Sequence, residues 1–191
     1  MNSRWALLIC GLATAMTGCR QPLERQPSSV QVVVDGGEFP ASLAGRWQAE
    51  QHGWEFVLEP GGRISSAVIS LGRVRVVPGR TTTVPTKTGS QAVFTPGAWI
   101  VHYVPATREL TVRITMAHVR VEMAGNIVEG SSTDVFEGPV SPAGDTWQVQ
   151  WTTFTKYTGH TPARTAFDLS TDPVYGEAKP LTFTKVVEQQ R

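Results

Sequence analysis

Hydrophobic and polar residues alternate along several segments of the chain. Side chains at every second position of a strand point to one face of a sheet, so this period predicts β-strands. The clearest runs are 54–58, 99–103, 110–116, 119–123 and 147–151. Each of these runs predicts a strand with one apolar face and one polar face.

The phase of the alternation changes once within a continuous stretch. Even-numbered positions are apolar up to Met116, and odd-numbered positions are apolar from Val119 onward. Because a change of phase moves side chains to the other face, it predicts a bulge or corner near Ala117. Gly125 and Asn126 then predict a two-residue hairpin turn.

The composition of residues 38–191 favours strands over helices throughout. This segment holds 44 β-branched residues (Val, Ile and Thr) and only six Leu, and β-branched residues fit a pleated sheet better than a helix. Proline and glycine interrupt it at short intervals, with long polar loops expected at 78–90 and 157–180. We predict an all-β domain of eight to ten antiparallel strands, as a barrel or, alternatively, as a two-sheet sandwich.

The N-terminus has the plan of a secretory signal. Arg4 precedes an apolar run over 5–16, which is too short to span a bilayer, and small residues follow. Met16-Thr17-Gly18-Cys19, at the end of this run, resembles the lipobox of bacterial lipoproteins. The resemblance implies cleavage before Cys19 and attachment of lipid to that cysteine. An ordinary cleaved signal with a chance cysteine is the alternative.

The lipobox resemblance sets the expected layout and location. Residues 1–18 are the signal peptide, 19–37 a lipidated tether and 38–191 the β-domain. The valines at 32–34 within the tether are compatible with a short edge strand. Arg20, in place of the Asp that retains lipoproteins in the inner membrane, favours the outer membrane facing the periplasm of a Gram-negative cell.

The charge balance excludes one class of partner. The chain carries 17 Lys and Arg against 16 Asp and Glu, a formal charge of +1, and removal of Arg4 with the signal makes the two counts equal. Nucleic-acid-binding proteins usually carry a clustered positive charge. We therefore expect no nucleic-acid partner, and the membrane is the first expected partner, through the lipid.

A second resemblance concerns the start of the domain. The segments 43–47 and 54–64 resemble the opening of lipocalin-like and avidin-like barrels, which begin with Gly-x-Trp followed by an aromatic-rich hairpin. Gly45 and Trp47 are the matching residues. In lipocalins a basic side chain late in the chain packs over this Trp, and the resemblance implies Lys185 in that role. It implies a fold and carries no ligand.

The side chains that usually carry catalysis or bind metal form no known motif. Glu55 and Glu59 are about 13 Å apart along one strand, which fits neither glycosidase geometry, so we assign them to a solvated face. The four histidines, His52, His102, His118 and His160, have no partner at metal-ligand spacing. We expect no catalytic residue, no metal and no cofactor.

The aromatic residues form the one notable constellation. Trp99 with Tyr103, and Trp147 with Trp151, each place two large rings on one strand face. If both faces point into one barrel, they would line an apolar cavity with polar tips. A packed core and an exposed carbohydrate platform are the alternatives.

These observations predict a membrane-anchored, non-enzymatic lipoprotein. Its β-barrel would bind a small apolar ligand through Trp99, Tyr103, Trp147 and Trp151. The alternative is a protein-interaction module of the cell envelope, such as an assembly factor or an enzyme inhibitor.

Overall fold

The computed structural model describes residues 30–70, 73–86, 89–123, 126–161 and 174–187. The expected signal peptide, Cys19 and most of the tether therefore lie outside the described residues. No helix in the described ranges is long and apolar enough to cross a membrane. The all-β prediction is confirmed, because a short 3-10 helix is the only helical element among these residues.

Twelve strands and one 3-10 turn make up the described chain, in a single sheet. In chain order they are β1 (Val30–Val34), η1 (Ala41–Leu43), β2 (Gly45–Ala49), β3 (Glu55–Leu58), β4 (Ile64–Ile69), β5 (Val74–Val76), β6 (Thr82–Pro85), β7 (Gln91–Val104), β8 (Glu109–Met123), β9 (Asn126–Pro139), β10 (Thr146–Thr161), β11 (Val174–Tyr175) and β12 (Lys179–Val186).

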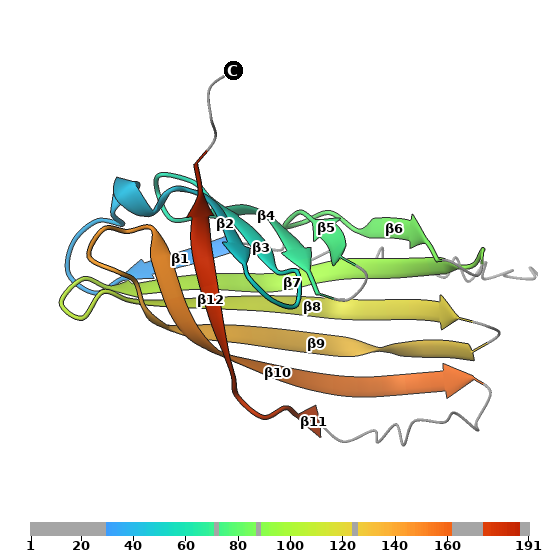
Figure 1. Cartoon of the computed structure of the whole chain (residues 1–191). Helices are drawn as coiled ribbons and strands as arrows, with labels where there is room; N and C mark the ends of the chain where they lie inside the picture. The colour runs from blue at the N-terminus through green and yellow to red at the C-terminus, as the bar shows by residue number, and fades with distance from the viewer. Residues whose placement is uncertain (1–29, 71–72, 87–88, 124–125, 162–173, 188–191) are drawn as a thin grey trace, which may run out of the picture.

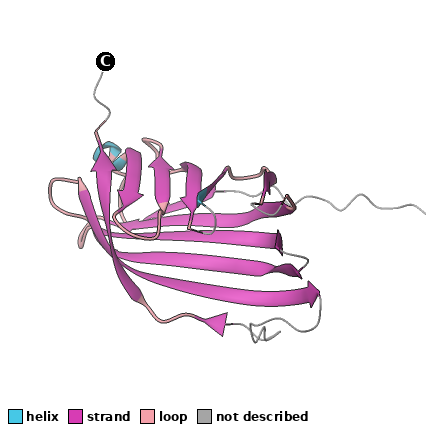
Figure 2. Cartoon of the chain, turned by 45° about the vertical axis from the view of Figure 1, so that its right-hand side comes forward, coloured by secondary structure: helices cyan, strands magenta, loops and turns pink. Residues whose placement is uncertain are grey.

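The sheet is curled, and the strand order explains its shape. Its order is β1-β7-β8-β9-β10-β12-β2-β3-β4-β5, with β6 added to β7 and β11 added to β10. β7 to β10 form a long twisted ribbon, and the last strand, β12, pairs with β10 on one side and with β2 on the other, which joins the ribbon to β2–β5 (Figure 1). Figure 2 shows the short strands standing over one part of the ribbon, while the rest of the ribbon extends beyond them.

Three features of the predicted barrel need correction. The described part of the chain has twelve strands instead of eight to ten. β1 runs parallel to β7, so the sheet is mixed. No backbone pairing joins β1 to β5 in the described ranges, because β5 has only three residues and the chain then returns to the edge of β7 as β6. The result is an open curled sheet.

The long ribbon confirms the predicted change of phase. The pairing of β8 shifts between Met116 and Val119 against β9, and β7 shifts beside it at Thr95–Trp99. Ala117 and His118 are exposed at this bulge. The hairpin turn was predicted one residue late, because Asn126 already pairs with Met123 as the first residue of β9.

The predicted long loops are also shorter than expected. β6 occupies Thr82–Pro85 within the predicted loop 78–90, and β10 continues to Thr161 within the predicted loop 157–180. The valine cluster forms the edge strand β1.

The hydrophobic core lies between the ribbon and the short strands that cover it. Trp47, Trp54, Trp99 and Trp147 are all at most 1% exposed. Phe56, Phe136 and Phe183 fill the space between the indoles, with ring centroids 4.9–6.5 Å apart in edge-on and stacked pairs. Such pairs stabilise a core beyond their buried area.

One end of the core is closed by residues of the Gly-x-Trp segment. Trp47 donates from Nε1 to the Leu43 carbonyl of η1 at 2.9 Å. Lys185, the cross-strand partner of Trp47, reaches past Gly45 and donates from Nζ to the Ser42 carbonyl at 2.7 Å. Gly45 has a φ of 131°, and a Cβ there would lie 2.8 Å from the Lys185 side chain. Glycine therefore lets Lys185 lie across this end of the core.

Candidate functional site

The four aromatic residues proposed to bind a ligand lie on the inner face of the sheet. Trp99, Tyr103 and Trp147 are at most 5% exposed, and Trp151 is half-buried. The indole nitrogens of Trp99 and Trp147 donate to the backbone carbonyls of Thr115 and Gly138 at 3.1 and 3.0 Å. Their polar tips are thus satisfied by the protein itself.

The structure does not gather these four residues around one space. Trp147 packs against Trp47 and Phe183, whereas Tyr103 packs edge-on against Phe39 with ring centroids 5.8 Å apart. In the described ranges no ring contact joins the β7 pair to the β10 pair. This arrangement favours the packed-core alternative for Trp99, Tyr103 and Trp147.

Trp151 lies at the margin of the core beside a buried carboxylate. Its Nε1 donates to Asp134 Oδ1 at 3.0 Å, and Thr153 Oγ1 donates to the same oxygen at 2.8 Å. Burial raises the pKa of Asp134 above its ordinary value, and the two hydrogen bonds offset only part of that rise. The His52 ring lies 5.1 Å from the Trp151 ring, and Lys179 Nζ lies 5.9 Å from it.

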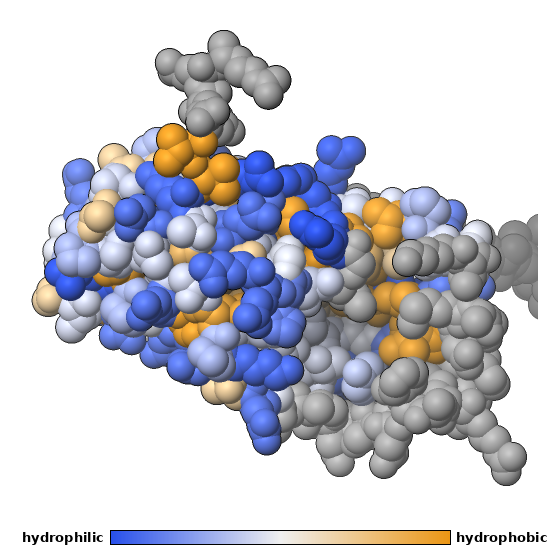
Figure 3. Space-filling model, in the orientation of Figure 1, coloured by the Kyte–Doolittle hydropathy of each residue, from blue (hydrophilic) through white to orange (hydrophobic). Residues whose placement is uncertain are grey.

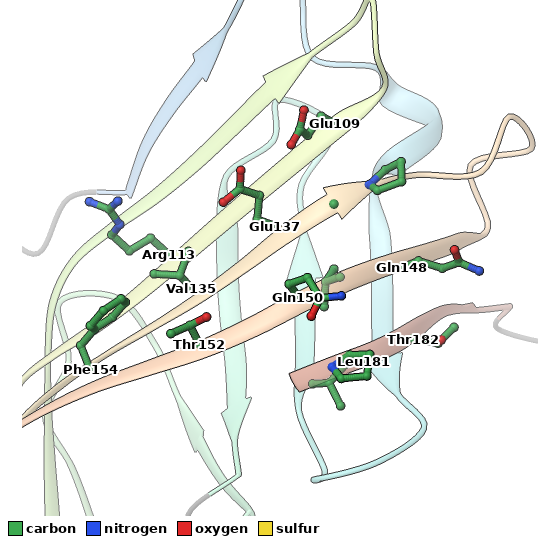
Figure 4. Close-up of a pocket in the computed structure, with 14 residues that line it drawn as sticks. Glu109, Arg113, Val135, Glu137, Gln148, Gln150, Thr152, Phe154, Leu181 and Thr182 are labelled. Atoms are coloured by element: carbon green, nitrogen blue, oxygen red, sulfur yellow. The ribbon is translucent and has the colours of Figure 1, made fainter. Parts of the chain in front are cut away.

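A groove lies on the opposite, outer face of the same strands. It has a volume of about 750 Å³, within the range of small-molecule sites. The polar side chains along it alternate with buried residues on β8, β9, β10 and β12, and the buried Val149 and Leu181 also line it. Figure 4 shows Leu181 beside Thr182 on β12. Its lining includes Glu109, Arg113, Glu137, Gln148, Gln150, Thr152, Pro180 and Thr182.

The sequence places these side chains on the outer face through simple alternation. Gln148 and Gln150 alternate with Trp147, Val149 and Trp151, which fill the core. β9 and β10 approach closely here, since a Cβ at Gly138 would lie 2.0 Å from the Gln148 carbonyl oxygen. The groove thus lies on the reverse side of the best-packed strands of the core.

The polar side chains of the groove have no partners among the residues that the structure describes. Across the described ranges, Glu109, Arg113, Glu137 and the two glutamines make no side-chain hydrogen bond or ion pair. The same holds for the hydroxyls of Thr152 and Thr182. Their donors and acceptors are therefore available to a molecule in the groove.

The charges of the groove are unevenly placed. Glu109 and Glu137 lie on neighbouring strands as diagonal neighbours, since Glu109 pairs with Pro139 and Glu137 with Thr111. Figure 4 shows the two carboxylates on one side and Arg113 farther along β8. With two carboxylates and one guanidinium, the groove carries a net charge of −1.

The remaining outer surface contains one clamp that sequence reasoning missed. Glu55, assigned to a solvated face, is buried between Arg46, at 2.6 Å, and Arg75. Burial alone would raise the pKa of Glu55, but the hydrogen bonds and charges of the two arginines outweigh it and hold the pKa below its ordinary value. Arg46 lies on β2, next to β3, and Arg75 lies on β5, which is separated from β3 by β4. Only the strand order therefore reveals these two partners of Glu55.

The histidines are dispersed. His52 lies in the turn between β2 and β3 with a φ of 60°, His102 contacts Asp35 at 3.1 Å, and His118 is exposed at the bulge. The side chain of His160 lies outside the described residues. Among the residues that the structure describes, no three His, Cys, Asp or Glu side chains are placed to hold a metal ion.

Large exposed apolar side chains are rare on the described surface. They are Val77 and Val187. In Figure 3 hydrophilic side chains dominate the half of the molecule that β12 crosses, with separate apolar spots between them.

Sequence reasoning missed the groove because a run of Gln, Thr and Glu on alternate positions is also typical of an ordinary solvated face. No family model, curated protein or solved structure matches this chain.

Proposed function

We propose that this chain is a membrane-anchored, non-enzymatic lipoprotein that acts by binding a polar ligand in the outer groove. The observation that supports the proposal is the set of polar side chains without internal partners around one hollow of about 750 Å³. Unpaired donors and acceptors on a rigid sheet are preorganised for ligand binding, because the core on the other face holds their strands in fixed positions.

The groove is a better candidate site than the space between the four aromatic residues. Three of those residues are fully packed, and none of the four lines the groove. A small apolar ligand would need an open apolar cavity in the core. The groove offers amides, hydroxyls and carboxylates beside apolar side chains such as Val135 and Pro180. We therefore propose a ligand that is polar and also carries some apolar surface, while the aromatic residues hold the strands in place.

The described surface also disfavours a protein partner that binds through an apolar interface. Such interfaces need a contiguous apolar patch, and the large exposed apolar side chains of the described residues are only Val77 and Val187. The envelope protein module remains the alternative reading, and it predicts a protein partner in place of a small ligand.

The anchor and the location complete the proposal. Lipid on Cys19 would hold the domain at the membrane, through more than one acyl chain as stable anchoring requires. Arg20 favours the outer membrane, with the domain facing the periplasm. The open curled sheet is proposed to be a relative of lipocalin-like barrels that has a filled interior and binds on its outside.

The test is native mass spectrometry of the protein purified from its own membranes. We expect a co-purifying small-molecule mass on the wild-type chain. Gln150→Trp should remove that mass, because a large side chain fills the groove. Gln48→Trp is the matched control, since Gln48 is also an exposed strand residue but lies on β2, outside the groove.

Three outcomes would count against the proposal. A protein mass in place of a small molecule would favour the interaction module. A small-molecule mass that survives Gln150→Trp would place the ligand elsewhere. A wild-type protein that carries no ligand, and takes up none from an extract of the envelope, would contradict the binding function itself.

A further inference from the structure

The backbone around the groove restricts what kind of polymer it can hold. β9 pairs with β8 on one side and, from Gln150↔Glu137 onward, with β10 on the other, while Thr146–Trp151 of β10 pair with β12. Peptides are commonly held by adding a strand to a free sheet edge, through main-chain hydrogen bonds. Over most of the groove each strand already has a paired neighbour on both sides, so side chains supply the larger share of the groups that can recognise a ligand.

The side chains present a two-dimensional array of hydrogen-bonding groups. Gln148, Gln150 and Thr152 follow one another at alternate positions of β10, about 7 Å apart, and Glu137 and Thr182 lie on the strands at either side, about 5 Å away. An amide offers donors and acceptors, a hydroxyl offers both, and a carboxylate accepts. Such an array is complementary to a ligand that carries many hydroxyl groups over a broad surface.

The charge of the groove further limits the chemical class of ligand that it can bind. Glu109 and Glu137 repel anions, and Arg113 is the single cation against them. A strongly acidic polymer, such as a nucleic acid or a polyuronate, is therefore disfavoured. A neutral ligand that donates hydroxyl protons to the carboxylates is accommodated, because hydrogen bonds with a charged acceptor are stronger than neutral ones.

We infer that the ligand is a neutral oligosaccharide chain laid across β8, β9, β10 and β12. The inference rests on the proposed function and specifies its ligand. Gln148, Gln150, Thr152 and Thr182 would hydrogen-bond its hydroxyls, and Glu137 would accept from a pair of them. Pro180 lies beside the glutamines in the groove and offers an apolar surface to the C–H face of a sugar ring.

The experiment is calorimetric titration of the full mature protein in a detergent that has no sugar headgroup. The probes are cellohexaose, the hexamer of N-acetylglucosamine, a hexagalacturonate and a neutral hexapeptide. We expect saturable binding of at least one neutral hexasaccharide. Binding of the acidic hexamer should be at least tenfold weaker, and the hexapeptide should not bind.

Two groove variants and one control locate the binding. Gln150→Ala and Glu137→Gln should each weaken saccharide binding about tenfold, which is the effect of one lost hydrogen bond to a charged or closely packed partner. Gln48→Ala removes the same side chain from an exposed position on β2 and should leave the affinity unchanged.

The outcomes separate this inference from the proposed function. If the hexapeptide binds, no saccharide binds, and Gln150→Ala weakens the peptide, the saccharide inference fails and the groove remains the binding site. If the acidic hexamer binds best, the charge argument fails. If a saccharide binds equally well to Gln150→Ala, Glu137→Gln and the wild type, the inference is wrong about the site, and the proposed function loses its groove.

Discussion

The two faces of the ribbon formed by β7 to β10 differ in how their polar groups are used. On the inner face, the indole nitrogens of Trp99, Trp147 and Trp151 all donate to oxygens of neighbouring strands. Trp54, which packs against Phe136 on this face from the segment before β3, is an exception, since its buried Nε1 has no partner among the described residues. On the outer face, the side chains of Glu137, Gln148 and Gln150 make no hydrogen bond or ion pair within the part of the chain that the structure describes.

This difference shows which face of the strands has polar groups that are available to bind a ligand. A buried polar group that is already paired contributes to stability and gives little to a ligand. An exposed polar group without a partner exchanges only water for ligand. Large aromatic residues therefore indicate the core of this sheet, and the groove is indicated by the smaller polar residues between them.

The largest effect on the inner face is expected from Trp147→Ala. Trp147 is 1% exposed and its ring contacts Trp47, Phe56 and Phe183. Removing a buried tryptophan leaves a cavity and costs about 3–5 kcal/mol. Urea unfolding followed by circular dichroism should show a clearly lower midpoint, and an unchanged midpoint would mean that this face is not the core.

Much of the fold was predictable because alternation reports faces directly. The strand runs and the bulge near Ala117 follow from the period of apolar residues, and the structure confirms both. The closure of the sheet was not predictable. It depends on the length of β5 and on the return of the chain to β7 as β6, and no local pattern encodes which edge a strand will join.

The site was less predictable than the fold, for a related reason. Gln150 and Glu137 become neighbours only through the register of β9 and β10, which the sequence does not show. Glu55 was misassigned because its two arginines lie on other strands. Asp134 lies on the inner face beside Phe136 at a position that alternation assigns to the core, so its burial could have been noticed as a conflict.

Asp134→Asn tests the inner face of the sheet through pH, because Asp134 is an ionisable group that is buried on that face. The raised pKa of Asp134 means that its favourable contribution is complete below the unfolded pKa, near 3.8, and is lost as pH rises through the folded pKa. Asparagine keeps an acceptor for Trp151 and Thr153 but has no charge. The variant should therefore gain stability relative to wild type as pH rises above about 3.8, as urea midpoints across pH would show.

Asp145→Asn is the matched control for this pH dependence. Hydrogen bonds from Ser141, with smaller ones from Thr146 and the backbone, lower the pKa of the exposed Asp145 carboxyl despite a small opposing effect of burial. The stability that this carboxylate provides is present above the unfolded pKa and lost as pH falls through the folded pKa. The two variants should change in opposite directions with pH. Parallel changes would show that burial does not raise the pKa of Asp134 above its ordinary value.

Gln150→Ala is expected to change stability very little, although it removes a central residue of the groove. Gln150 is exposed and has no internal hydrogen bond, and surface substitutions of this kind usually change stability by less than about 0.5 kcal/mol. The urea midpoint should match wild type while ligand binding falls. A large loss of stability would mean that the outer face is structural, and the contrast between the faces would disappear.

Cys19→Ser should have the smallest effect on the folded domain and the clearest effect on location. The proposed lipid would attach through Cys19, which precedes β1 in the chain, so the unfolding midpoint and the groove affinity should equal those of the wild type. Without the thiol no acyl chain can be attached, and the tether has no apolar segment that would hold the protein on a bilayer by itself.

Labelling cells with an alkyne fatty acid measures acylation of the protein, and separating membranes by ultracentrifugation measures its membrane attachment. Cys10→Ser is the control, because Cys10 lies in the part of the signal that is removed, and this variant should remain labelled and membrane-bound. A Cys19→Ser protein that is still labelled and sediments with the membranes would place the anchor elsewhere, while loss of ligand binding in a soluble and folded Cys19→Ser protein would show that the groove functions only at the membrane surface.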